Sequence, residues 1–117
     1  MKKEELGVWG ENEALAFLSN LGYRLIDRNI RFKKYEVDLV LVDGEDLVVV
    51  EVKARCTGQI GEPRRAVTKS KQRQIITVAD RYVQEHQIDR NVRFDIVSIV
   101  HNQNQTSIEH IADAFSA

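Results

Sequence analysis

Two long apolar runs separated by a short polar turn constrain this chain more than any other feature. The segment VDLVLVDGEDLVVVEVK, residues 37–53, is rich in β-branched residues on both sides of Gly44. It predicts two strands joined as a hairpin. Runs this apolar are typical of strands covered on both faces, so we expect the hairpin at the centre of a sheet flanked by helices.

The hairpin register follows from the length of the turn. A two-residue turn and a four-residue turn around Gly44 both place Val42 opposite Leu47, whereas a three-residue turn spoils the alignment. Continued along the strands, that register places Asp38 opposite Glu51. The sequence therefore predicts two facing carboxyl groups within its most apolar stretch.

The same register sets Glu36 opposite Lys53, and since side chains alternate with period two, all four charged residues point to one face. Directly opposed Cβ atoms lie about 5 Å apart, and two carboxylates at that distance repel each other. Either one carboxyl holds a proton, or a cation lies between Asp38 and Glu51. Mg²⁺ is bound in this way, through one or two carboxylates and water.

A first helix is predicted from residues 4–21, where apolar residues recur at helical spacing before Gly22. Glu11 lies within the arc defined by Ala14 and Leu18, so we expect its side chain to face the sheet. A structural explanation remains open, because an acid near the start of a helix is favoured by the macrodipole. Glu11 is nevertheless a candidate third carboxylate for the same site.

The remaining pattern completes an α/β domain. Extended structure is expected over residues 23–32, a helix over 70–85, a strand over 91–100, and a short strand or turn over 107–115. The order helix, three strands, helix, one or two strands predicts a sheet covered by two helices. A chain of 117 residues is the size of one domain, so residues 1–117 are expected to form a single unit.

Composition excludes several classes of protein. The formal net charge of −1 lacks the basic excess that by itself announces a nucleic-acid binder, so a polyanion must be held by a local patch or a bound metal. The single Cys56 cannot form an internal disulfide, and the three histidines have no metal-ligand spacing. With no leader pattern and no apolar run of about 20 residues, we expect a cytoplasmic protein without a membrane segment.

Four motifs in order resemble the YraN-like family of predicted endonucleases, which is similar to Holliday junction resolvases and belongs to the PD-(D/E)XK nuclease superfamily. They are GVWGENEALAFLSNLGY, YEVDLVLVDGEDLVVVEVKAR, GEPRRAVTKSKQRQ and RFDIVSIV. Tyr35 stands where the family usually has glycine, and Val37 replaces the nominal proline of the superfamily motif.

The resemblance implies a restriction-endonuclease-like fold, with a mixed central β-sheet flanked by helices. It also implies that Asp38 and Glu51 bind a metal, Mg²⁺ or Mn²⁺, that Lys53 is the catalytic lysine, and that Glu11 is a helix-borne acid at the same centre. A pair of carboxylates with a nearby lysine suits phosphodiester hydrolysis, because metal and amine can both stabilise negative charge on the phosphoryl group.

Candidate DNA contacts follow the hairpin. Arg55 comes two residues after Lys53, and the most basic run of the chain contains Arg64, Arg65, Lys69, Lys71 and Arg73. Lys71 and Arg73 are preferred, because the family pattern retains both. Such residues fix a nucleic-acid backbone in position without reading its sequence. A merely solvated strand end or helix end explains any one of them equally well.

Three functional hypotheses remain at this stage. The first is a Mg²⁺-dependent endonuclease acting on DNA, in particular on branched or structured DNA, with a possible homodimer for a symmetric substrate. The second is a non-catalytic nucleic-acid-binding module of the same fold. The third is that the acidic cluster is only a structural network of ion pairs.

Overall fold

The computed structural model describes residues 2–56, 67–102 and 104–117. Its elements are α1 (Lys3–Asn20), β1 (Arg24–Phe32), β2 (Tyr35–Asp43), β3 (Asp46–Cys56), α2 (Lys69–Glu85), β4 (Val92–His101) and β5 (Thr106–Phe115). The predicted order is confirmed, and the expected short strand or turn near the end is a ten-residue strand. Neither α1 nor α2 is long and apolar enough to cross a membrane.

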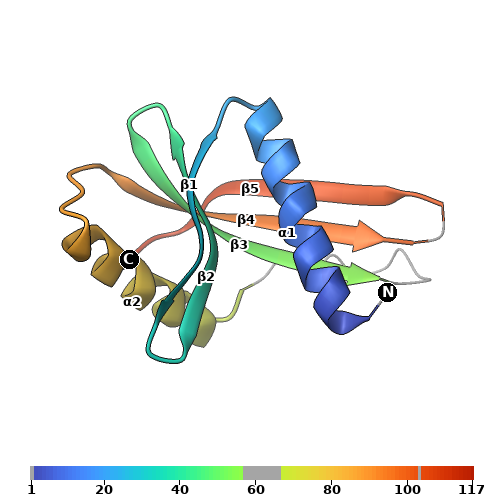
Figure 1. The fold of residues 1–117 in the computed structure, drawn as a ribbon, viewed down its shortest axis with the longest axis horizontal. Coiled ribbons are helices and arrows are strands. Elements are labelled where there is room, and N and C mark those ends of the chain that lie inside the picture. The colour runs from blue at the N-terminus through green and yellow to red at the C-terminus, as the bar shows by residue number, and fades with distance from the viewer. Residues whose placement is uncertain (1, 57–66, 103) are drawn as a thin grey trace.

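All five strands form one mixed sheet in the order β1-β2-β3-β4-β5. Strands β3 and β4 are parallel, with α2 lying between them in the chain, and the other three neighbouring pairs are antiparallel. A mixed sheet with two helices confirms the predicted α/β class. The sheet is strongly twisted, so that β1 and much of β2 run steeply across the direction of β3, β4 and β5 (Figure 1).

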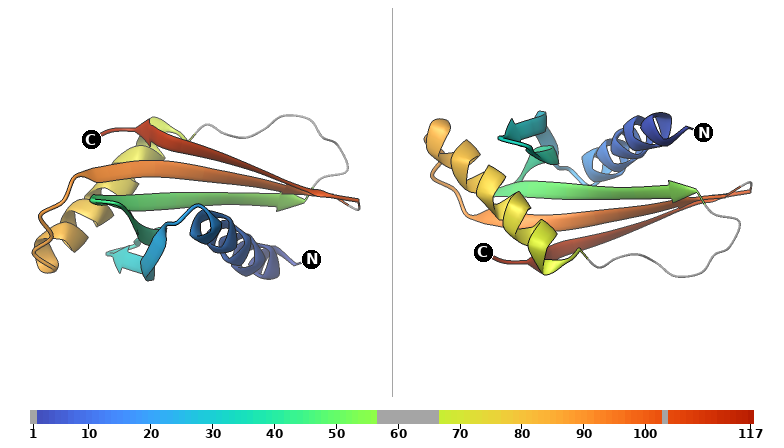
Figure 2. Two further views of the ribbon diagram at one scale, coloured as in Figure 1. Left: turned by 90° about the horizontal axis from the view of Figure 1, so that it is seen from above. Right: turned by 90° about the horizontal axis from the view of Figure 1, so that it is seen from below.

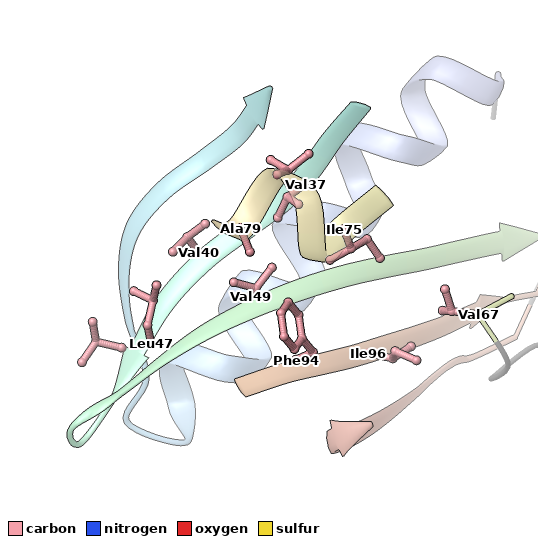
Figure 3. Close-up of a cluster of buried hydrophobic side chains, with 11 residues drawn as sticks. Val37, Val40, Leu47, Val49, Val67, Ile75, Ala79, Phe94 and Ile96 are labelled. Carbon is pink, nitrogen blue, oxygen red and sulfur yellow. The ribbon is translucent and has the colours of Figure 1, made fainter. Parts of the chain in front are cut away.

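Each helix packs against its own apolar cluster, and the two clusters divide the central strand by alternation. Val48 and Val50 of β3 pack with Ala14 and Leu18 of α1. Neighbouring positions on β3 pack instead with α2, in a cluster whose labelled members include Leu47, Val49, Ile75, Ala79 and Phe94 (Figure 3). The two helices therefore cover the sheet from opposite faces (Figure 2), as the uninterrupted apolar runs predicted.

The hairpin has the predicted register. Val42 pairs with Leu47, and the pairing of Asp43 with Asp46 leaves a two-residue turn in which Gly44 has a φ of 60°. Glycine adopts this left-handed conformation without steric cost, which explains its place in the turn.

The pairing between β2 and β3 ends early. Its last pair is Leu39 with Val50, one residue before Asp38 and Glu51. The ladder does not reach the expected pair of Glu36 and Lys53, because β2 has by then turned away from β3. Glu36 instead pairs with Arg31 in β1 and accepts a hydrogen bond from the Arg31 Nε at 3.1 Å.

A glycine allows α1 to lie directly on β3. A Cβ atom added at Gly10 would lie 2.4 Å from the Cβ of Ala54, and the next nearest atom belongs to Val52. The close approach of helix and strand brings the next residue of α1, Glu11, to the point where β2 and β3 part.

Candidate active site

Two carboxyl groups lie where β2 and β3 separate. Asp38 directly precedes Leu39, the last β2 residue paired with β3, and its Oδ2 accepts a hydrogen bond from the backbone N–H of Val52 at 2.8 Å. Glu51 occupies the corresponding place on β3 and is only 9% exposed. The Asp38 side chain therefore takes over a backbone donor that a continued ladder would have satisfied.

The pair is held close together and away from water. Burial, and after it the charge of Glu51, raises the pKa of Asp38 from 3.8 to about 8, against the opposing effect of the Val52 hydrogen bond. Burial also raises the pKa of Glu51, although the positive charges of Lys71 and Lys53 oppose it. Each carboxyl group affects the pKa of the other, and burial favours the neutral, protonated form of both.

A cavity of about 460 Å³ opens onto this pair. It is lined by Lys3, Leu6, Gly7 and Glu11 of α1, by Asp38 of β2, and by residues 51–55 of β3. The structure thus brings Glu11, Asp38, Glu51, Lys53 and Arg55, which the sequence singled out, into one cavity. The charged residues Asp38, Glu51 and Lys53 of the apolar hairpin therefore line a cavity.

The cavity lies at the edge of β3 that β2 leaves unpaired, and Glu51 at this edge is in contact with α2. Val48 and Val50 face α1, so by alternation Glu51 faces the side of α2. The contact made by Lys71 of α2 agrees, because its Nζ lies 3.7 Å from Glu51 Oε2. Glu11 reaches the cavity from α1 on the other side.

Glu11 lies beside the carboxyl pair but is bound to β1. Its Oε1 accepts a hydrogen bond from Asn29 Nδ2 at 3.0 Å and lies 3.6 Å from Arg28 Nη2. Its charge is near enough to contribute to the raised pKa of Asp38. The structure therefore confirms that Glu11 faces the site, and its role as a metal ligand stays a prediction.

The donor set fits a hard divalent cation. Asp38 and Glu51 offer carboxylate oxygens, and the repulsion between them is what a cation would relieve. The N–H of Val52 points to Asp38, and since the N–H and C=O of a strand residue point to the same edge, the Val52 carbonyl also lies on the cavity side. Among the described residues no three His, Cys, Asp or Glu side chains form a metal-binding group. Mg²⁺ would therefore rest on two carboxylates and water, as it commonly does.

The predicted DNA-contacting residues are placed differently from one another. Arg55 lines the cavity, and its Nε is buried without a hydrogen-bond partner in the described part of the chain. Lys71 forms the ion pair with Glu51, whereas Arg73 is exposed on α2. Arg64 and Arg65 lie outside the described residues.

A second polar cluster, centred on Arg93 of β4, was not identified from the sequence. Arg93 contacts Asp95 twice at 3.0 Å, Asp43 at 3.0 Å and the hydroxyl of Tyr23 at 2.6 Å. Asp95 is fully buried and also lies 2.7 Å from His110 Nε2. The available signal was the spacing of Arg93 and Asp95, which places two charges on one face of an otherwise apolar strand.

Burial on its own would raise the pKa of Asp95. Hydrogen bonds from Arg93, from the backbone N–H of Asp113 and from His110 outweigh it, so the pKa of Asp95 is lowered. The hydrogen bonds to Asp95 also raise the pKa of Arg93. The cluster is a satisfied buried network that fastens β4 to the β2-β3 turn, to β5 and to the start of β1, rather than a second open site.

Fold and site together define a class of protein. A mixed five-stranded sheet with two helices, in which two facing carboxyl groups lie where the central strands part, is compatible with the restriction-endonuclease-like fold. The family described as "Uncharacterised protein family UPF0102" matches residues 10–99. The chain belongs to this family, which is the YraN-like group that its motifs indicated.

Close relatives extend the match to nearly the full chain. A UPF0102 protein of Geobacter sulfurreducens is 47% identical, over 94% of this chain and 88% of the relative. A UPF0102 protein of Chlorobium chlorochromatii is 43% identical, over 95% and 91%. A third, from Parabacteroides distasonis, is 40% identical, over 99% and 96%.

Proposed function

We propose that the protein is a metal-dependent nuclease that hydrolyses phosphodiester bonds of DNA, in particular of branched or structured DNA. The observation that carries the proposal is the buried pair of Asp38 and Glu51, which opens onto a cavity also lined by Lys53. Buried like charges are costly, and folds retain them mainly where a cation or a reaction uses them.

Four residues that line the cavity have distinct tasks in this proposal. Asp38 and Glu51 would hold Mg²⁺ or Mn²⁺, and the chemistry that such an ion would supply is charge relief at the phosphate and activation of water. Lys53 orients the attacking water or balances the negative charge that develops on the phosphoryl group. Glu11, which lines the cavity from α1, would bind water near such an ion.

Arg55, Lys71 and Arg73 bind the DNA backbone in this proposal. Arg55 supports it most directly, because it lines the cavity and its guanidinium group suits the charge and geometry of a phosphate. Contacts of this kind bind structured DNA independently of its sequence. A symmetric junction would require a second copy of the chain, which makes a homodimer part of the proposal.

The test is cleavage of labelled four-way-junction, flap, single-stranded and duplex DNA in Mn²⁺, Mg²⁺ or EDTA. The native chain is compared with Glu51→Gln and Lys53→Met, which keep side-chain size while removing charge. We expect metal-dependent cleavage by the native chain and a loss of at least about a hundredfold in either variant. Thermal unfolding of each variant separates loss of activity from loss of structure.

Glu36→Gln is the matched control. Glu36 is an acid on the same strand as Asp38, but it pairs with Arg31 and does not line the cavity. It should cut DNA as the native chain does. If DNA is bound but not cut under any condition, the alternative of a non-catalytic binding module replaces the nuclease; if DNA is neither bound nor cut, the proposal of a DNA substrate is wrong.

A further inference from the structure

Lys71 contacts Glu51 of the carboxyl pair, although it comes from a helix on the opposite side of the sheet from Glu11. Helix α2 is fixed at its start by Thr68, whose hydroxyl accepts a hydrogen bond from the backbone N–H of Lys71 at 3.1 Å. From this capped turn the Lys71 Nζ lies 3.7 Å from Glu51 Oε2. In this contact the Lys71 side chain is 40% exposed and the Glu51 side chain is 11% exposed.

In the absence of a metal, this arrangement places the positive charge of Lys71 beside the Glu51 carboxylate. Asp38 is close enough to repel Glu51, and burial removes the water that would screen the repulsion. Lys71 offsets part of that cost. The first turn of α2 also contains no acidic residue that would draw the amine elsewhere.

The same charge opposes a divalent cation. An ion bound between Asp38 and Glu51 would sit on the carboxylate that Lys71 now contacts, and two positive charges a few ångströms apart repel each other. A metal ion must therefore either displace the Lys71 amine or bind less tightly because of its repulsion. A residue whose only task is to contact a DNA phosphate would not have this effect.

We propose that Lys71 is the built-in counter-ion of Glu51 in the metal-free protein, and that it competes with the divalent cation for this carboxylate. It is a positioning residue, which stabilises the metal-free fold and weakens metal binding. The inference rests on the proposed function in one respect, namely that Asp38 and Glu51 bind a divalent ion.

The experiment is calorimetric titration of Mn²⁺ into the native chain, Lys71→Met and Lys71→Arg, without DNA. Met favours helix as Lys does but removes the charge. We expect Lys71→Met to bind Mn²⁺ about tenfold more tightly, the size of effect that one charge exerts on a nearby dication at a partly exposed site. Lys71→Arg, which keeps the charge, should bind within about twofold of the native chain.

Thermal unfolding in EDTA supplies a second readout, and Lys69→Met is the control. Lys69 begins the same helix, is exposed, and has no ion pair with a described residue. Without metal, Lys71→Met should unfold at a lower temperature than Lys69→Met, although it binds Mn²⁺ more tightly. If Lys71→Met does not fold, Lys71→Gln is titrated in its place.

The outcomes separate this inference from the proposed function. Equal or weaker Mn²⁺ binding by the charge-removing variant, beside clear binding by the native chain, overturns the role of Lys71 and leaves the metal site standing. A native chain that binds no Mn²⁺ overturns both.

Discussion

Gly10 provides the sharpest test of how α1 is seated on the sheet. We predict that Gly10→Ala destabilises the protein relative to Gly7→Ala, although both replace glycine by alanine inside the same helix. A Cβ at position 10 meets the Cβ of Ala54 at 2.4 Å, whereas a Cβ at position 7 meets no atom within 4 Å. The Ala54 methyl is fixed to the backbone of β3 and cannot rotate away, so helix and strand must move apart.

The magnitude follows from two opposing effects. Replacing glycine by alanine inside a helix stabilises it by about 1 kcal/mol, and this gain cancels when the two variants are compared. Forcing an extra methyl into a closely packed contact costs about 1–3 kcal/mol. Gly10→Ala should therefore be less stable than Gly7→Ala by about 1–3 kcal/mol, or by roughly 4–12 °C in unfolding temperature for a domain of this size.

Urea unfolding of the two variants and of Gly10→Ala combined with Ala54→Gly measures the effect. The second substitution removes the methyl that clashes, so the double variant should recover much of the packing loss, beyond what the single effects predict by addition. Equal stability of Gly7→Ala and Gly10→Ala would refute the close contact between α1 and β3. A double variant that is merely additive would place the cost somewhere other than Ala54.

Two further predictions concern charge. The pKa of Asp38 is raised from 3.8 to about 8 in the folded chain, so the folded chain binds a proton that the unfolded chain releases between these values. The stability of the metal-free protein should therefore fall as pH rises from about 4 to about 8, and urea unfolding in EDTA should show a shallower fall in Asp38→Asn. The same pH dependence in Asp38→Asn and in the native chain would contradict the raised pKa of Asp38. Arg93→Met leaves the fully buried Asp95 without its main partner and should cost about 3–5 kcal/mol, whereas Arg31→Met, which breaks the more exposed pair with Glu36, should cost less than about 1 kcal/mol. Equal losses in the two arginine variants would show that Arg93 does not fasten the sheet.

The hairpin and the convergence of its charges could be predicted because both depend on local rules. The turn length sets the register of Val42 and Leu47, and alternation then carries Asp38 and Glu51 to matching positions. The helical spacing of the apolar residues was sufficient to predict that Glu11 faces the sheet. The predicted pairing of Glu36 with Lys53 was wrong, because the register was extended beyond the point at which β2 and β3 separate.

Contacts between distant segments could not be predicted in the same way. Tyr23 and Arg93 are 70 residues apart, and only the packing of β4 beside β3 brings them together. Lys71 and Glu51 likewise meet only once α2 is laid against the sheet. The basic run at the start of the helix indicated Lys71 as a candidate DNA contact, but not that its amine would reach Glu51.

Both outer strands of the sheet interrupt their own hydrogen-bonding pattern. In β1 an extra residue, Ile26, lies between the paired Leu25 and Asp27, and in β5 extra residues lie between Ile111 and Phe115, including Asp113 with a φ of 53°. A regular outer strand offers a row of free donors and acceptors to any other extended chain, and such bulges disrupt that row. The irregularities therefore oppose edge-to-edge association of the sheet with other chains, to which a sheet with so many valines in its central strands would otherwise be prone.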